Sequence, residues 1–296
     1  MDTVLSKAAL LKPYLAAALT ILIWGAMPTV TQIAVLDMDA LAAGVLRTLL
    51  AGIFVAPFIF RSSFPKPKGR QQWQSLGVVA LCGFVGFTLL FSVGSSMTSP
   101  LHSTLINSMN PFFTGLFGVL AVQLMPTKKW FLGMAISFSG VVYIVVAKDA
   151  AQGSSSVMGD ILCLLSAMFV GLGYVNGSHL AKQIGTLAVT FWAVFVASVL
   201  QIPLILYVWD LQDVLAVSLN GWLALAYLSL GSTLVAYIAW YWALAHGGVT
   251  RIAPMQFLMP VVGLPLAVLV FGESLTIMLV GSAFLIVAGV YFSTKG

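Results

Sequence analysis

Residues 13–35 read PYLAAALTILIWGAMPTVTQIAV, a predominantly apolar run without a charged side chain. A transmembrane helix needs about 20 such residues, so the run is long enough to span a bilayer. It is too long for the core of a signal peptide. Barrel strands alternate apolar and polar residues over about ten positions, and this run does not. Because lipid offers no partner to unpaired backbone groups, the run predicts a membrane-spanning helix.

The composition of the whole chain extends this interpretation. Of the 296 residues, 60% are hydrophobic and 7% are charged, whereas about 25% are charged in an ordinary soluble domain. So few charges exclude a soluble enzyme, a disordered chain, a secreted disulfide scaffold and a DNA-binding domain. Short charged, Gly or Pro turns separate the apolar runs. These runs predict an all-α polytopic membrane protein with ten transmembrane helices, near residues 13–35, 40–60, 73–95, 99–124, 130–147, 157–179, 185–208, 220–245, 251–271 and 275–293.

The basic residues are distributed unevenly among the predicted loops. If both termini share one side, eleven of the thirteen basic residues lie on that side and only Lys148 lies in a loop opposite. Cytoplasmic loops carry such an excess of Lys and Arg. We therefore expect a multi-pass protein of the cytoplasmic (inner) membrane with both termini cytoplasmic. The eleven residues are Lys7, Lys12, Arg61, Lys66, Lys68, Arg70, Lys128, Lys129, Lys182, Arg251 and Lys295.

The second half of the chain repeats features of the first half. A shift of 146–149 residues places Asn110-Pro111 on Met259-Pro260, and it also pairs Thr127 with Thr276, Trp73 with Trp222 and Tyr143 with Tyr291. Residues 1–150 and 151–296 would then hold five helices each, within one transport domain. Since five is odd, the second repeat enters the membrane from the opposite face. Such inverted repeats can open a central site alternately to either side, although duplication is also a simple way to build a stable bundle.

Three motifs, taken in order with this ten-helix duplication, resemble a known family. They are Trp24-Gly25, the stretch LRTLLA at Leu46–Ala51, and PVVGLPLAVLVFGESLT, which begins at Pro260 and includes Glu273. Over nearly its whole length the chain resembles the drug/metabolite transporter superfamily of EamA type, and within it the YddG-type exporters of aromatic and other neutral amino acids. The resemblance implies two EamA-like repeats and an export function. The first half has Gln123-Leu124-Met125 where the second has the acidic turn, which argues against a symmetric role for Glu273.

Charge within the predicted spans is scarce. Arg47 is the only base well inside a span, about seven residues or roughly 10 Å from the end of its helix. Intramembrane charge is expensive and often functional, so Arg47 is either a partner for a substrate carboxylate or a structural, snorkelling side chain. Its repeat mate is Ala193, which argues against a place on the central axis. Sugar-phosphate carriers would need several bases, and Glu273 lies at a helix end. We therefore expect a neutral, zwitterionic or apolar substrate.

Two carboxamides form the best central pair. Asn107 and Gln256 are repeat mates, each four residues before a proline, Pro111 or Pro260, and Asn110 shares a helix face with Asn107. Carboxamides in lipid must be hydrogen-bonded, so they line a cavity or join helices directly. The prolines free backbone carbonyls and are predicted to act as hinges.

Aromatic and sulfur side chains share helix faces and could complete the site. Aromatic faces bind aromatic or ammonium groups, and Met adapts to varied shapes. Packing or lipid contact is the alternative for each residue. The candidates are Trp24 and Met27, Phe84 and Phe87, Tyr174, and Tyr237, Trp240 and Tyr241.

These features predict a membrane transporter that exports small neutral metabolites, above all aromatic or other neutral amino acids, by alternating access through a central cavity. The alternatives are a multidrug or apolar-cation exporter, an intramembrane enzyme and a scaffold. We expect no enzymatic activity, no cofactor and no metal, because no CxxC, HExxH or CxxH spacing occurs. The expected partners are a small-molecule substrate and the lipid bilayer, with no nucleic acid. The chain would be a monomer or a weak homo-oligomer.

Overall fold

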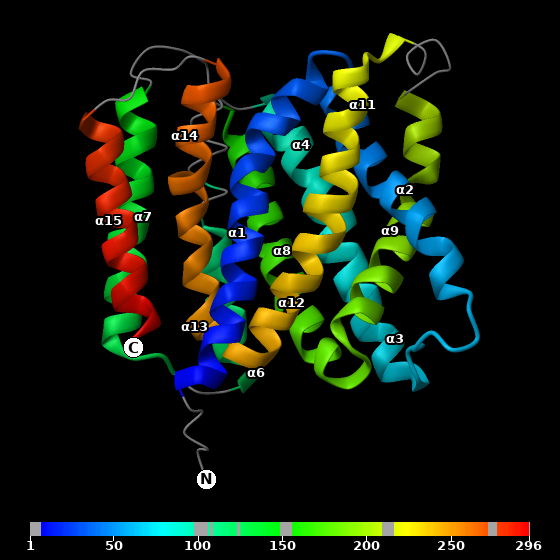
Figure 1. The fold of residues 1–296 in the computed structure, drawn as a ribbon, viewed down its shortest axis with the longest axis horizontal. Coiled ribbons are helices and arrows are strands. Elements are labelled where there is room, and N and C mark those ends of the chain that lie inside the picture. Colours follow the sequence, from blue (N-terminus) through cyan, green and yellow to red (C-terminus); the bar gives the residue numbers. More distant parts are fainter. Residues whose placement is uncertain are drawn as a thin grey trace.

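A computed structural model describes residues 7–97, 106, 109–122, 125–148, 156–208, 216–271 and 277–295. Its regular structure is entirely helical within these ranges, and most of the helices run side by side along one common direction (Figure 1). The prediction of an all-α polytopic membrane protein is confirmed. The ten-helix, two-repeat arrangement fits this bundle, whereas the repeat boundary near residue 150 lies outside the described residues.

The first half contains five spans. The elements are α1 (Lys7–Val35), α2 (Ala40–Ile59), α3 (Gly69–Val78), η1 (Val79–Gly86), α4 (Phe87–Met97), α6 (Asn110–Val122) and α7 (Lys128–Lys148). The third span consists of α3, η1 and α4 in sequence, and the fourth is described only in part, by α6. The carboxylate of Asp39 begins α2 by accepting hydrogen bonds from the backbone N–H groups of Leu41 and Ala42, at 2.8 and 3.2 Å, which satisfies two donors that have no partner within the helix.

The second half follows the same order. Its elements are α8 (Val157–Ile184), α9 (Thr186–Val208), α11 (Leu219–Ala226), η2 (Tyr227–Val235), α12 (Ala236–Gly247), α13 (Val249–Ile252), η3 (Ala253–Leu258), α14 (Met259–Phe271) and α15 (Ile277–Thr294). Gly185 and Gly248 follow α8 and α12 with φ angles of +90° and +86°. Only glycine adopts such angles without strain, so these residues end the two helices.

Several of these helices are long enough to cross a membrane. Among the described residues, six helices are both long and apolar enough, namely Leu11–Val35, Leu41–Ile59, Gly69–Phe91, Val157–Ile184, Thr186–Ile205 and Leu219–Gly247, and shorter apolar helices cover Asn110–Ala121 and Ala283–Thr294. The predicted spans agree with most of the described helices to within a few residues. The exceptions are α1, which begins at Lys7 rather than near residue 13, and α8, which extends to Ile184 rather than ending near residue 179.

Two of the spans contain a segment of π-helix, which the apolar pattern did not predict. The segments η1 and η2 interrupt the third span of each half, and their first residues are 148 positions apart. The hydroxyl of Thr233 donates to the carbonyl of Leu228, five residues earlier, at 2.8 Å, which fits the wider π-turn. The same distortion at the same place in both halves is a structural sign of the repeat.

The two halves pack through equivalent contacts. At Gly83 and Gly173 the backbones of η1 and α8 meet, since a Cβ on Gly173 would lie 2.5 Å from the Cα of Gly83. The equivalent contact joins η2 to α1, where Trp24 donates to the carbonyl of Ser232. Gly83 corresponds to Ser232, and Trp24 to Gly173, under one shift of 149 residues. These paired contacts are those of a two-repeat bundle.

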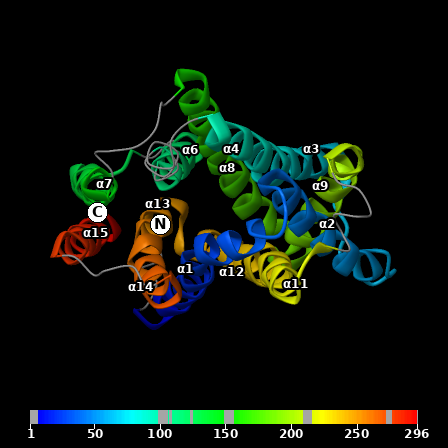
Figure 2. The same ribbon diagram turned by 90° about the horizontal axis from the view of Figure 1, so that it is seen from above.

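Seen from above, the bundle has an outlying pair and a continuous main body. The helices α7 and α15 lie together at one edge, whereas α14, α1, α12 and α11 follow one another along one side of the body (Figure 2). The outlying pair is joined closely through small residues, because the hydroxyl of Ser137 in α7 donates to the carbonyl of Ile286 in α15 at 3.2 Å. Small residues at such contacts let membrane helices approach.

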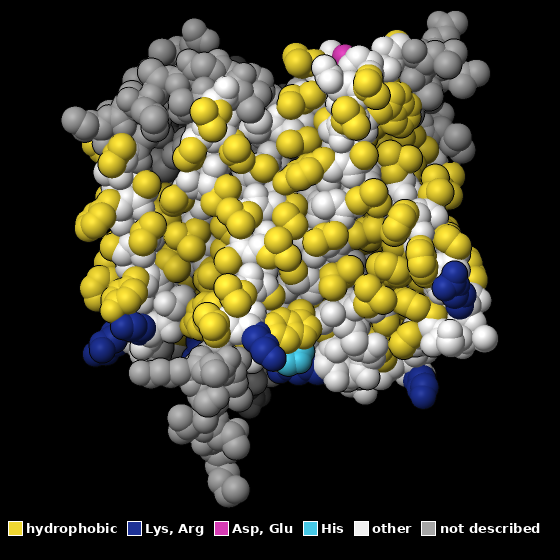
Figure 3. All heavy atoms as spheres, in the orientation of Figure 1, with side chains coloured by type: hydrophobic (Ala, Val, Ile, Leu, Met, Phe, Trp, Pro, Cys, Tyr) yellow, Lys and Arg dark blue, Asp and Glu magenta, His cyan; other side chains and the backbone are white. Residues whose placement is uncertain are grey.

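The surface of the bundle separates apolar from basic side chains. Figure 3 shows hydrophobic side chains over the middle of the visible face, with Lys and Arg side chains gathered at the end where the N-terminus lies. An acidic side chain is visible at the opposite end. An apolar band between polar ends is the surface that a bilayer requires.

Candidate functional site

Six aromatic side chains meet in the interior, between the two halves of the chain. Trp24 of α1 stacks on Tyr174 of α8 with ring centroids 5.7 Å apart, and it meets Tyr237 of α12 edge-on at 5.2 Å. Phe84 of η1 stacks on Tyr237 at 4.4 Å. We call this group the central aromatic cluster. Its members are Trp24, Phe84, Tyr174, Tyr237, Trp240 and Tyr241.

Hydrogen bonds to the π-segments hold two members of the cluster in place. The indole Nε1–H of Trp24 donates to the carbonyl of Ser232 at 3.0 Å, and the hydroxyl of Tyr237 donates to the carbonyl of Gly83 at 3.1 Å. A π-turn leaves carbonyls that the regular helical pattern does not use. Since Gly83 and Ser232 are repeat equivalents, each half offers one such carbonyl to an aromatic donor.

The side chains of the cluster are almost completely buried. Trp240 and Tyr241 have no solvent exposure, and Tyr237 is 2% exposed. The indole N–H of Trp240 and the hydroxyl of Tyr241 have no hydrogen-bond partner among the described residues. Phe87 is half-buried and stacks instead on Phe91, with centroids 5.8 Å apart. The predicted aromatic residues therefore meet in the interior, apart from Phe87, and their role in binding stays a prediction.

Arg47 lies beside this cluster. Its Nη1 contacts the sulfur of Met27 at 3.5 Å, and its guanidinium is close enough to Tyr174 and Tyr237 to interact electrostatically with both. Its Nε is buried without a hydrogen-bond partner in the described part of the chain. The structure thus brings Arg47 to the interior, although the identity of its repeat mate argued against such a place.

Gln256 approaches the same cluster from the ninth span. This span is broken: α13 gives way to the 3-10 segment η3, which contains Gln256, and α14 begins only at Met259. The Gln256 side chain faces the hydroxyl of Tyr174, is 5% exposed and has a buried Oε1 without a hydrogen-bond partner. Mid-helix 3-10 segments often mark functional hinges, and Pro260 follows this one in the first turn of α14.

The repeat equivalents of these residues are only partly described. Pro111 lies in the first turn of α6, and the carbonyl of Asn110, the first residue of that helix, accepts a hydrogen bond from the hydroxyl of Thr114 at 2.8 Å. Asn107 and Glu273 lie outside the described residues. The pairing of Asn107 with Gln256 across the site, and the hinge role of both prolines, therefore stay predictions.

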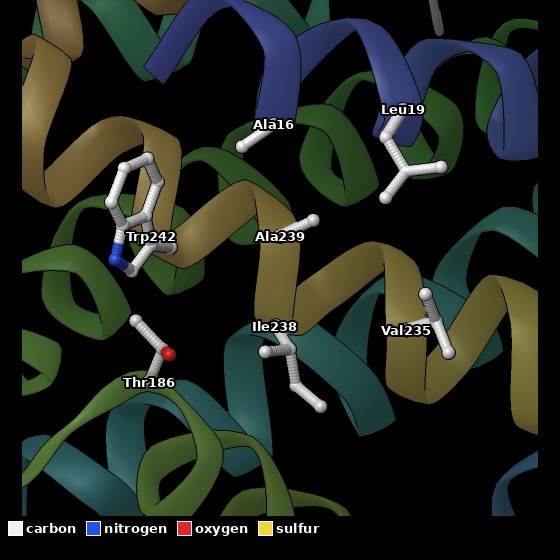
Figure 4. A pocket seen from close by; sticks show the side chains of 7 residues that line it. All are labelled: Ala16, Leu19, Thr186, Val235, Ile238, Ala239 and Trp242. Carbon is white, nitrogen blue, oxygen red and sulfur yellow. The ribbon is translucent and has the colours of Figure 1, made fainter. Parts of the chain in front are cut away.

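A separate groove lies on the side of the bundle. It has a volume of about 280 Å³, is almost entirely apolar and is walled by side chains of α1, α9 and α12 (Figure 4). Leu19 and Val235, which line it, are 45% and 46% exposed. It uses the face of α12 that points away from Tyr237 and Trp240. None of the predicted site residues lines this groove, whose chemistry resembles that of the surrounding lipid-facing surface.

The described residues do not gather the set of ligands that a metal ion needs. Within it, no three His, Cys, Asp or Glu side chains gather closely enough to hold a metal ion. Among the described residues, the side chains that converge on the central aromatic cluster include the Arg47 guanidinium and the Gln256 carboxamide. Such a set can bind a small organic molecule by stacking and hydrogen bonding.

The sequence of the chain matches a known protein family. The model of the EamA-like transporter family matches residues 11–146 and again residues 157–295. The chain belongs to the EamA-like transporter family. It is therefore a multi-pass membrane transporter, and the resemblance seen in its motifs is confirmed. The family indicates transport rather than catalysis as the activity.

Named relatives point in the same direction. The chain is 32% identical to the uncharacterized transporter YdeK of Bacillus subtilis (strain 168) over 253 residues, which cover 84% of this chain and 85% of that protein. It is 27% identical to a probable amino-acid metabolite efflux pump of Salmonella typhimurium, over 95% of this chain and 94% of that protein. A solved crystal structure shares the fold with a TM-score of 0.79 at 19% identity, covering 96% of both chains.

Proposed function

We propose that this EamA-type transporter exports small neutral metabolites, chiefly aromatic or other neutral amino acids, by alternating access. The observation that carries the proposal is the central aromatic cluster, which joins both halves of the chain and has a guanidinium at its edge. Aromatic walls suit an apolar or aromatic side chain, and the guanidinium suits a carboxylate. Relatives named as probable amino-acid metabolite efflux pumps support the same substrate class.

The proposed orientation of the chain in the membrane rests on its basic side chains. The basic side chains gather at the end of the bundle where the N-terminus lies (Figure 3), and cytoplasmic ends of inner-membrane proteins carry such an excess. We place both termini in the cytoplasm. A cysteine in the exposed loop that contains Lys68 should react with a membrane-impermeant maleimide only in inside-out vesicles. A cysteine at Leu36, which is 79% exposed near the other end, should react only in right-side-out vesicles.

Transport itself is tested with purified protein in liposomes. Vesicles loaded with unlabelled phenylalanine, leucine or tryptophan should accumulate the same labelled amino acid by counterflow, and empty liposomes should not. Absence of counterflow for every neutral amino acid would overturn the proposed substrate class. Counterflow of apolar cations alone would support the alternative of a multidrug exporter, whose substrates aromatic faces can also hold.

A further inference from the structure

Arg47 is a half-buried base for which the described part of the protein provides no anionic partner. Its Nη1 contacts the sulfur of Met27, a weak acceptor, and its Nε has no partner. The groups that interact with its charge are the hydroxyls of Tyr174 and Tyr237, and no carboxylate is among them. A guanidinium within a membrane span, partly removed from water, is unfavourable without an anion or a full set of hydrogen bonds. Its environment therefore suits an anionic group that arrives from outside the chain.

Two described acids at the end of the bundle opposite the N-terminus are engaged elsewhere. Asp39 caps the N-terminus of α2, and Asp37 accepts hydrogen bonds from the backbone N–H and the hydroxyl of Ser218. Neither carboxylate is therefore the partner of Arg47. The guanidinium itself has five N–H donors, and it binds a carboxylate through two parallel hydrogen bonds.

A matching acceptor also lies close to Tyr174. Gln256 faces the Tyr174 hydroxyl, and its Oε1 is buried without a partner although the residue is only 5% exposed. An acceptor of this kind lowers the free energy of a bound N–H donor. Tyr174 is thus close to two residues with unsatisfied groups. Arg47 has a charge without an anionic partner, and Gln256 has an acceptor oxygen without a donor. A ligand that satisfies both must carry an anionic group and a hydrogen-bond donor.

We propose that the site recognises the backbone of a zwitterionic α-amino acid, with its α-carboxylate on Arg47 and its α-ammonium on the Oε1 of Gln256, while the central aromatic cluster contacts its side chain. This inference rests on the proposed function and names the atoms that would select its substrate. A free cation would be repelled by Arg47. A phosphate dianion would need more bases than this single arginine.

The first test compares ligands on the wild-type protein in liposomes. Unlabelled phenylalanine should inhibit counterflow of labelled phenylalanine at least tenfold better than phenylalaninamide, which lacks the carboxylate. Phenylalanine should also inhibit more strongly than 3-phenylpropanoate, which lacks the ammonium, by a similar factor. Equal inhibition by phenylalanine and phenylalaninamide would overturn the role of Arg47 without any variant, and this result would leave amino-acid export standing. Absence of phenylalanine transport would instead contradict the proposed function itself.

The second test assigns each preference to its residue. Arg47→Gln should raise the KM for phenylalanine at least tenfold and abolish the preference over the amide, whereas Arg47→Lys should restore part of it because a point charge remains without the bidentate geometry. Gln256→Leu should abolish the preference over 3-phenylpropanoate only. Arg61→Gln, which removes an exposed charge just beyond the end of the same helix, is the matched control and should change neither preference. An Arg47→Gln protein that keeps the wild-type KM and selectivity would contradict the inference.

Discussion

At the scale of single residues, the interior contains polar atoms that the described protein does not satisfy. Gln201 in α9 is the clearest case away from the proposed site, because it is 1% exposed and neither Nε2 nor Oε1 has a hydrogen-bond partner. Its neighbour one turn earlier, Ser198, is satisfied, since its hydroxyl donates to the carbonyl of Thr48 at 2.8 Å. An unpaired buried amide lowers stability by about 1–3 kcal/mol. Gln201 therefore destabilises the fold unless it contacts a ligand or water.

Replacing Gln201 by an apolar side chain of similar shape should stabilise the protein. Gln201→Met removes both unsatisfied atoms and keeps the volume, so we expect the free energy of unfolding to rise by about 1–3 kcal/mol. Ser198→Ala is the control, which breaks a satisfied hydrogen bond and should lower it by about 0.5–1.5 kcal/mol. Unfolding in detergent, followed by circular dichroism, measures both variants. A loss of stability in Gln201→Met would reveal that a water or ligand occupies this position.

At the scale of elements, the π-segments join the two halves through their carbonyls. Trp24 and Tyr237 donate to the carbonyls of Ser232 and Gly83. Tyr237→Phe removes one donor and leaves a buried carbonyl without it, so unfolding should become easier by about 1–3 kcal/mol. Tyr291→Phe changes a tyrosine that is 55% exposed and should leave stability nearly unchanged. Equal stability of the two variants would show that the π-segment does not depend on this hydrogen bond.

The crossing of η1 and α8 depends on the absence of side chains. A Cβ on Gly173 would lie 2.5 Å from the Cα of Gly83, whereas a Cβ on Gly77 would meet no atom within 4 Å. Gly173→Ala should therefore force the two helices apart and destabilise the protein by about 1–3 kcal/mol. Gly77→Ala should be neutral or slightly stabilising, since alanine favours helix. A thermal melt of both variants tests this, and a wild-type melting temperature for Gly173→Ala would contradict the close crossing.

The elements also show what sequence reasoning can reach in this fold. Lipid requires long apolar helices, so the spans could be placed from composition alone, as with α2 and α9. The π-segments and η3 could not, because the VALCGFVG of η1 is a continuous apolar run in which no residue marks a π-turn. At the candidate site, helical spacing brought Tyr237, Trp240 and Tyr241 onto one face. It could not fix the rotation of α2 against its neighbours, and so it left the surroundings of Arg47 open.

At the scale of the whole molecule, the repeat equivalence suggests that the two ends of the bundle alternate between closed and open. At the end opposite the N-terminus, Asp37 in the turn between α1 and α2 accepts hydrogen bonds from the backbone N–H and hydroxyl of Ser218, the first cap residue of α11. At the other end, the Nε2 of Gln72 donates to the Oε1 of Gln183 at 2.9 Å. Each link joins the first half of the chain to the second. Under alternating access each end opens once in every cycle, so each of the two links must break in turn.

A covalent bond in place of the first link should therefore stop transport. In a protein whose Cys82 and Cys163 are replaced by Ala, the pair Asp37→Cys and Ser218→Cys should form a disulfide on oxidation, because the two side chains are already in contact. Amino-acid counterflow should then fall to the level of empty liposomes and recover on reduction. Each single cysteine variant is the control and should keep its flux under oxidant. If the fully cross-linked protein still carried substrate at the reduced rate, this end would not need to open between α1 and α11, and the moving parts would have to be sought among the other helices of the bundle.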